Sequence, residues 1–250
     1  MTPEEWLGKK VKASVIIFDE FHLYYYWGDS FRPLMWEAFY EISLHSSLSI
    51  ALTATLSEVM QFEISHFGSN FNSIFWVDYG NQGLKFKPNK YIKAPSKEWL
   101  MKQITSESKD DGVKLIFCPF REQVIELEKK LSGIGFDCLS CVGGEGSMMI
   151  QKLSINPDPD FIICTTVLSH GVNLPSLKKI YFLYAVNNLD FWIQMIARGG
   201  RRGEPYEVFS LENPHDLDWN RWQNSFEVLK LSVRKYFSRQ PLLNQLFISK

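Results

Sequence analysis

The sequence predicts an α/β protein built from two parallel-sheet units and a C-terminal helix. Short apolar runs alternate with helical stretches, the pattern of a parallel sheet covered by helices. A polar stretch containing glycine, proline and lysine, residues 81–97, separates two groups of these runs. We therefore expect a first unit over residues 1–90, a linker over 91–97, a second unit over 98–215 and a helical tail over 216–250.

The individual elements follow from local patterns. Predicted strands of the first unit cover residues 15–18 and 48–52, and those of the second cover 113–118, 136–142, 161–164, 180–184 and 206–210. Residues 121–131 carry Val124, Leu127 and Leu131 at helical spacing. After Pro214, aromatic and aliphatic residues recur at three- and four-residue steps, which predicts a helix that packs on the second unit.

Composition narrows the class of protein. With 250 residues and 45% hydrophobic content, the chain can bury a sizeable core. A net charge of −1 argues against a large basic surface, so any nucleic-acid contact must come from a local groove. No apolar run reaches the length of a membrane span, and charged residues stand where a signal peptide needs an apolar core. We expect a cytoplasmic protein with no membrane partner.

The cysteines offer one candidate pair. Cys118 and Cys164 lie in apolar runs, which leaves Cys138-x-x-Cys141 for metal or redox chemistry. Two thiols cannot complete a four-ligand zinc site. We expect ordinary reduced thiols, with a redox pair or a site shared with another chain as the alternatives.

An acidic pair follows the first predicted strand. Asp19 and Glu20 stand at a strand's carboxyl end, where open α/β sheets place their ligands. An aspartate there can hold Mg²⁺ through nucleotide phosphates, and a neighbouring carboxylate can orient and deprotonate water. The alternative is an exposed acidic pair that caps a helix. Three further motifs favour the chemistry: Thr53-Ala54-Thr55, Gly171-Val172-Asn173-Leu174-Pro175 and Gln194-Met195-Ile196-Ala197-Arg198-Gly199-Gly200-Arg201.

The tetrad Asp19-Glu20-Phe21-His22 resembles the second motif of superfamily 2 helicases of the DExH-box variety. The resemblance covers nearly the whole chain and implies tandem RecA-like lobes that use ATP and Mg²⁺. It implies that Asp19 holds Mg²⁺, that Glu20 activates water and that His22 makes an interdomain contact. Thr53 and Thr55 match the third motif, which couples hydrolysis to strand movement in the family.

An aromatic segment lies between these two motifs. Trp27-Gly28-Asp29-Ser30-Phe31-Arg32-Pro33 resembles the loop with which RecQ-type helicases sense single-stranded DNA. Trp27 and Phe31 can stack on bases, at about 1–3 kcal/mol each, and Arg32 can take a phosphate or a base plane. The alternative is a buried aromatic cluster beneath a helix that begins at Pro33. The preceding Tyr24-Tyr25-Tyr26 departs from the polar residues of RecQ enzymes.

Two segments of the second unit match motifs that contact nucleic acid. Leu115-Ile116-Phe117-Cys118, followed by Pro119-Phe120-Arg121, looks like the fourth motif. Thr165-Thr166 and the Gly171 segment match the fifth, which implies threonine contacts to a phosphate of the strand and nucleotide contacts by Gly171 and Asn173. This fifth motif is closer to Ski2-like and Hel308-like helicases than to RecQ, so the subfamily stays open.

The sixth motif contributes arginines. Gln194, Arg198 and Arg201 match its pattern, with Ala197 in place of the first glycine. The resemblance implies that Gln194 contacts nucleotide or water and that both arginines stabilise the transferring phosphate across the domain cleft. The alternative is a basic helix end favoured by the helix dipole.

A phosphate-binding loop is absent from the sequence, which has no Gly-x-x-x-x-Gly-Lys-Ser/Thr segment. Thr2-Pro3-Glu4 resembles the motif that precedes the acidic motif, so we expect an incomplete first lobe. A half sheet would leave an unpaired edge and apolar surface, which favours self-association or an upstream polypeptide carrying the Walker A loop.

The function implied by the resemblance is ATP-driven translocation on, or unwinding of, nucleic acid. Single-stranded or partly duplex DNA, read 3′ to 5′, is the expected substrate, with RNA as the alternative. We expect the chain alone to be inactive in hydrolysis because positioning by the phosphate loop supplies most of phosphoryl-transfer catalysis. The second hypothesis is a non-catalytic nucleic-acid-binding or assembly subunit.

Overall fold

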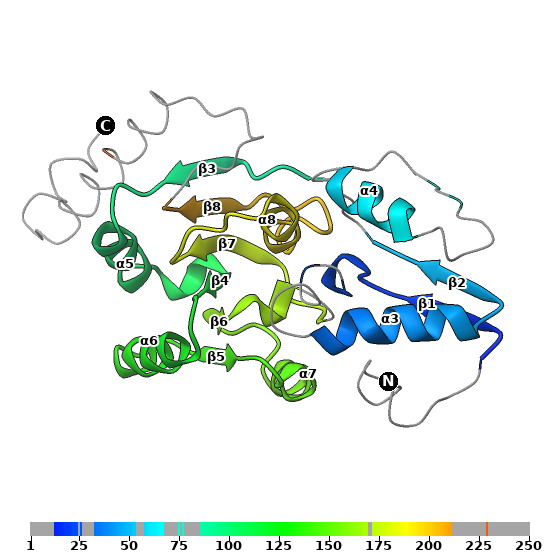
Figure 1. Ribbon diagram of the computed structural model, residues 1–250. Helices are drawn as coiled ribbons and strands as arrows, with labels where there is room; N and C mark the ends of the chain where they lie inside the picture. Colours follow the sequence, from blue (N-terminus) through cyan, green and yellow to red (C-terminus); the bar gives the residue numbers. More distant parts are fainter. Residues whose placement is uncertain are drawn as a thin grey trace, which may run out of the picture. The chain divides into compact units, whose positions relative to one another are not determined.

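The chain divides into two compact units, Met1–Gly83 and Leu84–Lys250. The computed structural model describes residues 13–24, 26, 33–53, 58–67, 75, 77, 86–169, 172–211 and 229. Each unit is an α/β arrangement of parallel strands and helices (Figure 1). The parallel α/β class predicted from the alternation of apolar runs and helical stretches is confirmed.

The first unit contains a βαβ crossover. Strands β1 (Val15–Phe18) and β2 (Leu48–Ala51) pair in parallel, and α3 (Pro33–His45) connects them. Helix α4 (Glu58–Phe67) follows. Because side chains alternate along a strand, Phe18 enters a buried cluster with Phe39 and Ile42 of α3 and Met60 of α4.

The opposite face of this two-stranded sheet is exposed. Its side chains Val15, Ile17, Leu48 and Ile50 keep between 36% and 60% of their surface exposed, whereas Phe18 keeps 2%. Register places Val15 beside Leu48 and Ile17 beside Ile50, so the four side chains lie on one face. The described part of this unit therefore has one packed and one open sheet face.

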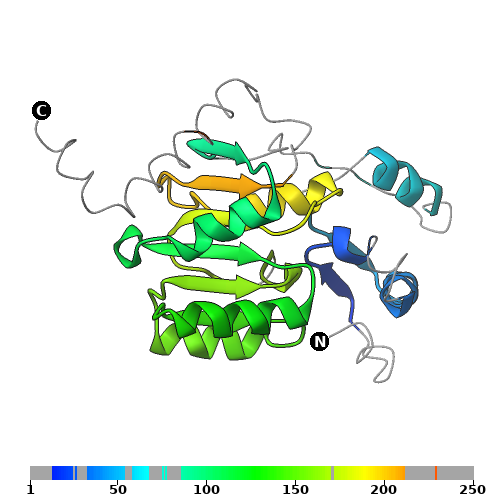
Figure 2. The ribbon, with the colours of Figure 1, turned by 90° about the vertical axis from the view of Figure 1, so that its left-hand side faces the viewer.

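The second unit is built on a six-stranded sheet whose pairings are all parallel, in the order β3-β8-β7-β4-β6-β5 (Figures 1 and 2). Its strands are β3 (Lys90–Lys93), β4 (Val113–Phe117), β5 (Cys138–Cys141), β6 (Phe161–Cys164), β7 (Leu177–Phe182) and β8 (Glu207–Ser210). The central strands β4 and β6 are buried along their whole length. This burial explains why both read as continuous apolar runs in the sequence.

Helices cover both faces of this sheet (Figure 2). They are α5 (Lys97–Thr105), α6 (Arg121–Gly133), α7 (Gly146–Ile155) and α8 (Leu189–Ile196), with short 3₁₀ turns η2 (Lys109–Asp111) and η3 (Thr166–Ser169). One core layer takes Ile104 of α5 and Leu127 of α6, and the other takes Met149 of α7 and Trp192 of α8. Side-chain caps begin two helices: Ser96 accepts from the Trp99 amide and Asn188 from the Phe191 amide.

The segment expected to be a linker, residues 91–97, contains regular secondary structure. It holds most of β3 and the first residue of α5, and β3 pairs with β8 from Lys90–Glu207 to Lys93–Ser210. The hydropathy pattern does not reveal this strand because β3 is the edge strand of the sheet, and edge strands commonly carry lysines such as Lys90. An ion pair of 3.6 Å between Lys90 and Glu207 adds to the pairing.

Several strand ends also differ from prediction. β7 begins at Leu177 and ends at Phe182, where residues 180–184 were expected, and β5 is shorter than 136–142. Apolar residues such as Leu183 continue into the core after the backbone ladder has ended, so hydrophobicity overstates the strand. The predicted tail helix lies outside the described residues, apart from Leu229.

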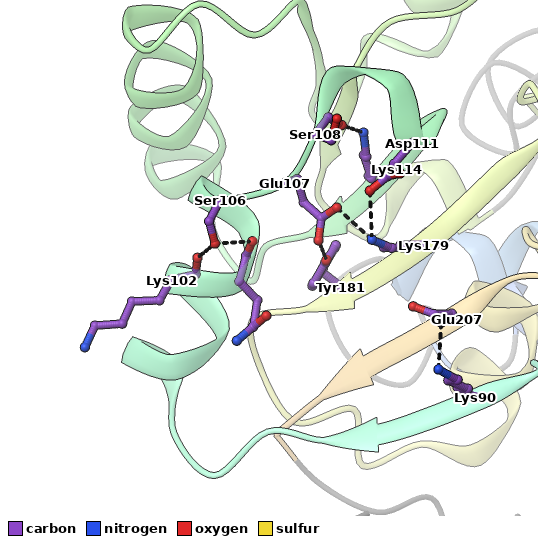
Figure 3. A network of polar contacts seen from close by, with 11 residues as sticks. Lys90, Lys102, Ser106, Glu107, Ser108, Asp111, Lys114, Lys179, Tyr181 and Glu207 are labelled. Atoms are coloured by element: carbon purple, nitrogen blue, oxygen red, sulfur yellow. Dashed lines mark hydrogen bonds and ion pairs between the residues drawn. The ribbon is translucent and has the colours of Figure 1, made fainter. Parts of the chain in front are cut away.

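A polar network fastens the connection between α5 and β4 (Figure 3). Glu107 forms a 2.7 Å ion pair with Lys179 and accepts a 2.6 Å hydrogen bond from the Tyr181 hydroxyl. Lys114 is buried and donates to the Ser108 carbonyl, and its burial lowers the pKa of the amine. Lys114 and Lys179 lie in the amino-terminal halves of β4 and β7, away from the carboxyl edge of the sheet.

Candidate functional site

A carboxylate turn ends β1 in the first unit. Asp19 is exposed and Glu20 is partly exposed, directly after the buried Phe18. The Glu20 amide donates a 2.9 Å hydrogen bond to Oδ1 of Asp19, and Glu20 has a φ of 50°, in the left-handed region. A non-glycine residue is uncommon in that region, so the turn directs two adjacent carboxylates to the carboxyl end of the strand at a backbone cost. Such carboxylates are suitable ligands for a hard cation such as Mg²⁺.

The second and third motifs are joined by a hydrogen bond within this unit. His22 is fully buried, and its Nδ1 lies 2.9 Å from Oγ1 of Thr53 and 3.7 Å from Oε2 of Glu20. The backbone adds a 2.8 Å bond from the Phe21 amide to the Leu52 carbonyl. The contact described for His22 thus lies inside the first unit, whereas an interdomain contact was expected.

The aromatic segment is only partly described. Tyr24 packs on Phe18 and Phe21, with ring centroids 5.4 Å and 6.1 Å apart, so this tyrosine belongs to the core. The predicted site residues Trp27, Phe31, Arg32, Thr55 and Gly171 lie outside the described residues.

In the second unit, the loops that follow β4, β5 and β6 meet at the carboxyl edge of the sheet. The Cys118 amide donates to the Cys164 carbonyl at 2.8 Å, and the Thr165 amide donates to the Cys141 carbonyl at 3.3 Å. Thr165 is partly exposed and Thr166 is exposed where η3 begins. Two predicted site residues therefore lie on the surface of this edge.

The end of the fourth-motif segment and the turn after β5 also lie at this edge, and of these Glu145 carried no sequence-based expectation. Phe120 keeps 62% of its surface exposed, and Arg121, also exposed, lies 3.8 Å from a carboxylate oxygen of Glu145. Glu145 closes the turn through Gly143 and Gly144 by accepting from the Val142 amide at 3.2 Å. The sequence signal that could have found this loop is a Gly-Gly pair immediately after a predicted strand.

The two predicted arginines differ in environment. Arg198 is 4% exposed, and its Nη1 donates a 2.7 Å hydrogen bond to the Val172 carbonyl, which joins the sixth motif to the fifth. Arg201 is exposed, and its Nε donates to the Ala197 carbonyl one helical turn earlier at 3.3 Å. Gln194 is buried on α8, whereas Asn173 is exposed. Of the two guanidinium groups, Arg201 is the one presented to solvent.

The cysteines of the second unit are poor nucleophiles. Burial raises the pKa of the Cys118 thiol to about 12 and those of Cys138 and Cys141 to about 11. Burial also raises the pKa of Cys164 well above its ordinary value. Because the thiolate is the reactive form, these groups are unsuited to thiolate chemistry near neutral pH.

Among the described residues, no helix has the length and apolar character needed to cross a membrane.

Comparisons with known proteins point to helicases. A family model described as the helicase conserved C-terminal domain matches residues 96–203. The probable ATP-dependent DNA helicase RecS of Bacillus subtilis is 26% identical over 222 residues, which cover 84% of this chain and 43% of that protein. These matches support a superfamily 2 helicase. The ATP-dependent DNA helicase RecQ of Synechocystis is also 26% identical, over 94% of this chain and 51% of its own length.

Solved structures share the fold of this chain. S. cerevisiae Dbp5, solved bound to RNA and ADP BeF3, superposes with a TM-score of 0.64 and 16% identity, covering 94% of this chain and 62% of that chain. The RecA-like lobe architecture is therefore confirmed. The helicase chain spans about half the length of the two bacterial relatives that it matches.

Proposed function

We propose that the chain is the core of an ATP-driven DNA translocase or helicase. The observation that carries the proposal is the hydrogen bond between His22 and Thr53, which fastens the carboxylate turn to the segment after β2. A motor must pass changes at its nucleotide to the segments that hold its track, and this bond provides such a connection within the first unit. The names of the RecS and RecQ relatives support DNA as the track.

By resemblance, the motif residues of each unit are assigned separate roles in nucleotide chemistry. Asp19 would hold Mg²⁺, which when bound would neutralise phosphate charge, and Glu20 would orient and deprotonate the attacking water. Arg201, exposed at the sixth motif, stabilises the negative charge of the transferring phosphoryl group. Arg198 holds the fifth and sixth motifs together through the Val172 carbonyl. Gln194, Asn173 and Gly171 remain nucleotide contacts by resemblance.

The nucleic-acid track is assigned to the carboxyl edge of the second sheet. The hydroxyls of Thr165 and Thr166 and the guanidinium of Arg121 are suited to phosphate oxygens. The exposed ring of Phe120 offers a face on which a base can stack. The aromatic segment with Trp27, Phe31 and Arg32 stays a prediction for single-strand contact.

A second candidate is a non-catalytic DNA-binding subunit, which the exposed Phe120 and Arg121 at the carboxyl edge of the second sheet also support. Under the motor proposal, ATP turnover requires a phosphate-binding loop. The two candidates share DNA binding and differ in hydrolysis. A cytoplasmic location also stays a prediction from the sequence.

Binding of single-stranded DNA by the purified chain tests what the two candidates share. Arg121→Gln should weaken binding about three- to tenfold and reduce the slope of log affinity against log salt by about 0.7, the value for one phosphate contact. Lys129→Gln removes the same charge from an exposed position two turns along α6 and serves as the matched control. Fluorescence anisotropy across a salt series measures both effects. Equal losses in the two variants, or no binding by the parent chain, would contradict the assignment.

A further inference from the structure

The arginine turn of the sixth motif is packed directly against an aromatic ring. Gly199 and Gly200 are buried, and a Cβ added to Gly199 would lie 2.4 Å from Cδ2 of Tyr206. A Cβ added to Gly200 would lie 2.7 Å from Cε1 of the same ring, and Gly200 has a φ of 65°. Both distances are too short for any real Cβ, so the two glycines allow the Arg198–Arg201 segment to lie against Tyr206.

Tyr206 is itself held from the opposite side. It is 1% exposed, and its hydroxyl donates a 2.9 Å hydrogen bond to the Phe86 carbonyl, while its own carbonyl accepts from the Asn89 amide at 2.8 Å. The Phe86 side chain approaches the same turn, because its Cβ lies 3.3 Å from the Cβ position of Gly200. The arginine turn is thus enclosed by the tyrosine ring and by Phe86, a residue near the start of the second unit.

We propose that Tyr206 and Phe86 form a clamp that positions the arginine turn, residues 198–202, so that Arg201 presents its guanidinium in a fixed direction. The inference rests on the proposed function in one respect, since Arg201 is taken to contact a nucleotide phosphate. Positioning matters for that role because misplacing a charged group by about 1 Å can cost a factor of about 10² in rate. Tyr206 and Phe86 are positioning residues in this scheme, and neither contacts the nucleotide.

The clamp predicts that substitutions at Gly199 and Tyr206 have non-additive effects on the turn. The ring of Tyr206 occupies the space into which a side chain at position 199 would project. The effects of substituting the two residues on the conformation of the turn should therefore depend on each other. Gly199→Ala should dislodge the turn while Tyr206 is present. In the double variant with Tyr206→Ala, the added methyl group has room, so Gly199→Ala should cause little further change. An additive result would mean that the contact does not hold the turn.

Hydrogen–deuterium exchange on the full chain measures the turn without requiring activity. Tyr206→Phe keeps the ring and removes the bond to the Phe86 carbonyl, so exchange at amides 199–203 should rise about five- to tenfold, with β4 and β7 unchanged. Tyr181→Phe is the matched control, because it removes another buried tyrosine hydroxyl bond in this unit, to Glu107. It should raise exchange near Glu107 and leave the turn unchanged.

The outcomes separate the clamp from the proposed function. Unchanged exchange at the turn in both Tyr206→Phe and Gly199→Ala would overturn the clamp, as would a uniform rise across the unit in Tyr206→Phe. Selective exchange at the turn, together with non-additive effects of Gly199→Ala and Tyr206→Ala, would support it. Loss of DNA binding or absence of hydrolysis would count against the proposed function alone, since the exchange pattern does not depend on either.

Discussion

The sixth motif shows how two identical side chains separate into different roles at the scale of residues. Arg198 is buried against the Val172 carbonyl, while Arg201 is exposed four residues from the carbonyl of Ala197 to which it donates. A buried guanidinium group needs hydrogen-bonding partners to offset the cost of its desolvation, so substituting it lowers the stability of the fold. An exposed one is available for a ligand.

Alanine substitutions should separate these roles. Arg198→Ala should lower the free energy of unfolding by about 2–3 kcal/mol, because a buried charged hydrogen bond is lost. Arg201→Ala should change it by less than about 0.5 kcal/mol and, in a fusion that carries a phosphate-binding loop, should reduce ATP hydrolysis by about 10³, the range for a missing arginine finger. Thermal unfolding and a hydrolysis assay of both variants measure the contrast. A destabilised Arg201→Ala protein with a stable Arg198→Ala partner would refute it.

Sequence reasoning finds residues whose chemistry is local and misses those whose partners are distant. Asp19 and Glu20 were predicted because they follow an apolar strand, and their turn is described as expected at that strand end. Tyr206 carries no such signal, because its partner Phe86 lies 120 residues away in the sequence. The burial of Arg198 was equally hidden, since the Val172 carbonyl becomes a partner only when the chain is folded.

At the scale of elements, the network around Glu107 fixes the entry to β4 and gives a pH-dependent prediction. Burial opposes the charge on Lys179, but Glu107 and Asp111 outweigh it and raise the pKa of this lysine above 10.5. A lysine whose pKa is higher in the folded state than in the unfolded state stabilises the folded state below about pH 10.4. This stabilisation is lost as the pH rises through the folded-state pKa. Glu107→Gln should therefore cost about 2 kcal/mol near pH 7, and the difference from the parent should narrow above pH 10.5. Urea unfolding at several pH values measures it, and a cost independent of pH would show that the ion pair is not the cause.

The two faces of the β1–β2 pair give a second prediction at this scale. Phe18→Ala should destabilise the first unit by about 3–5 kcal/mol, because Phe18 is buried among Phe39 and Ile42. Ile17→Ala, one residue earlier and 60% exposed, should cost less than about 1 kcal/mol. Hydrogen–deuterium exchange of the β2 backbone amides measures the stability of the first unit separately from that of the second. Similar costs at both positions would mean that the exposed face is covered in solution.

Edge elements were the hardest to predict. The central strands β4 and β6 were predicted within one residue because burial on both faces makes them continuously apolar. β3 was taken for a linker because an edge strand needs few apolar residues and tolerates lysine on its solvent side. Hydropathy therefore locates the middle of this sheet better than its border.

The molecule consists of two units that differ in how much buried core is described in each. The second unit has a six-stranded sheet with a buried core on each face, whereas the first has one described cluster on a two-stranded sheet. We expect Leu84–Lys250, expressed alone, to fold cooperatively and to bind single-stranded DNA within about tenfold of the full chain. Circular dichroism melting and anisotropy test this expectation. A non-cooperative melt would show that the second unit depends on the first.

The central claim, a DNA-dependent ATP motor, is tested most directly by hydrolysis once a phosphate loop is supplied. A segment that carries a phosphate-binding loop can be fused ahead of this chain, and ATP turnover can be measured with and without single-stranded DNA. We predict turnover that DNA stimulates and that Glu20→Gln reduces by at least about 10², with Glu37→Gln, an exposed glutamate on α3, as the unaffected control. A folded fusion that binds DNA but hydrolyses ATP no faster than its Glu20→Gln variant would contradict the claim and favour the non-catalytic binding subunit.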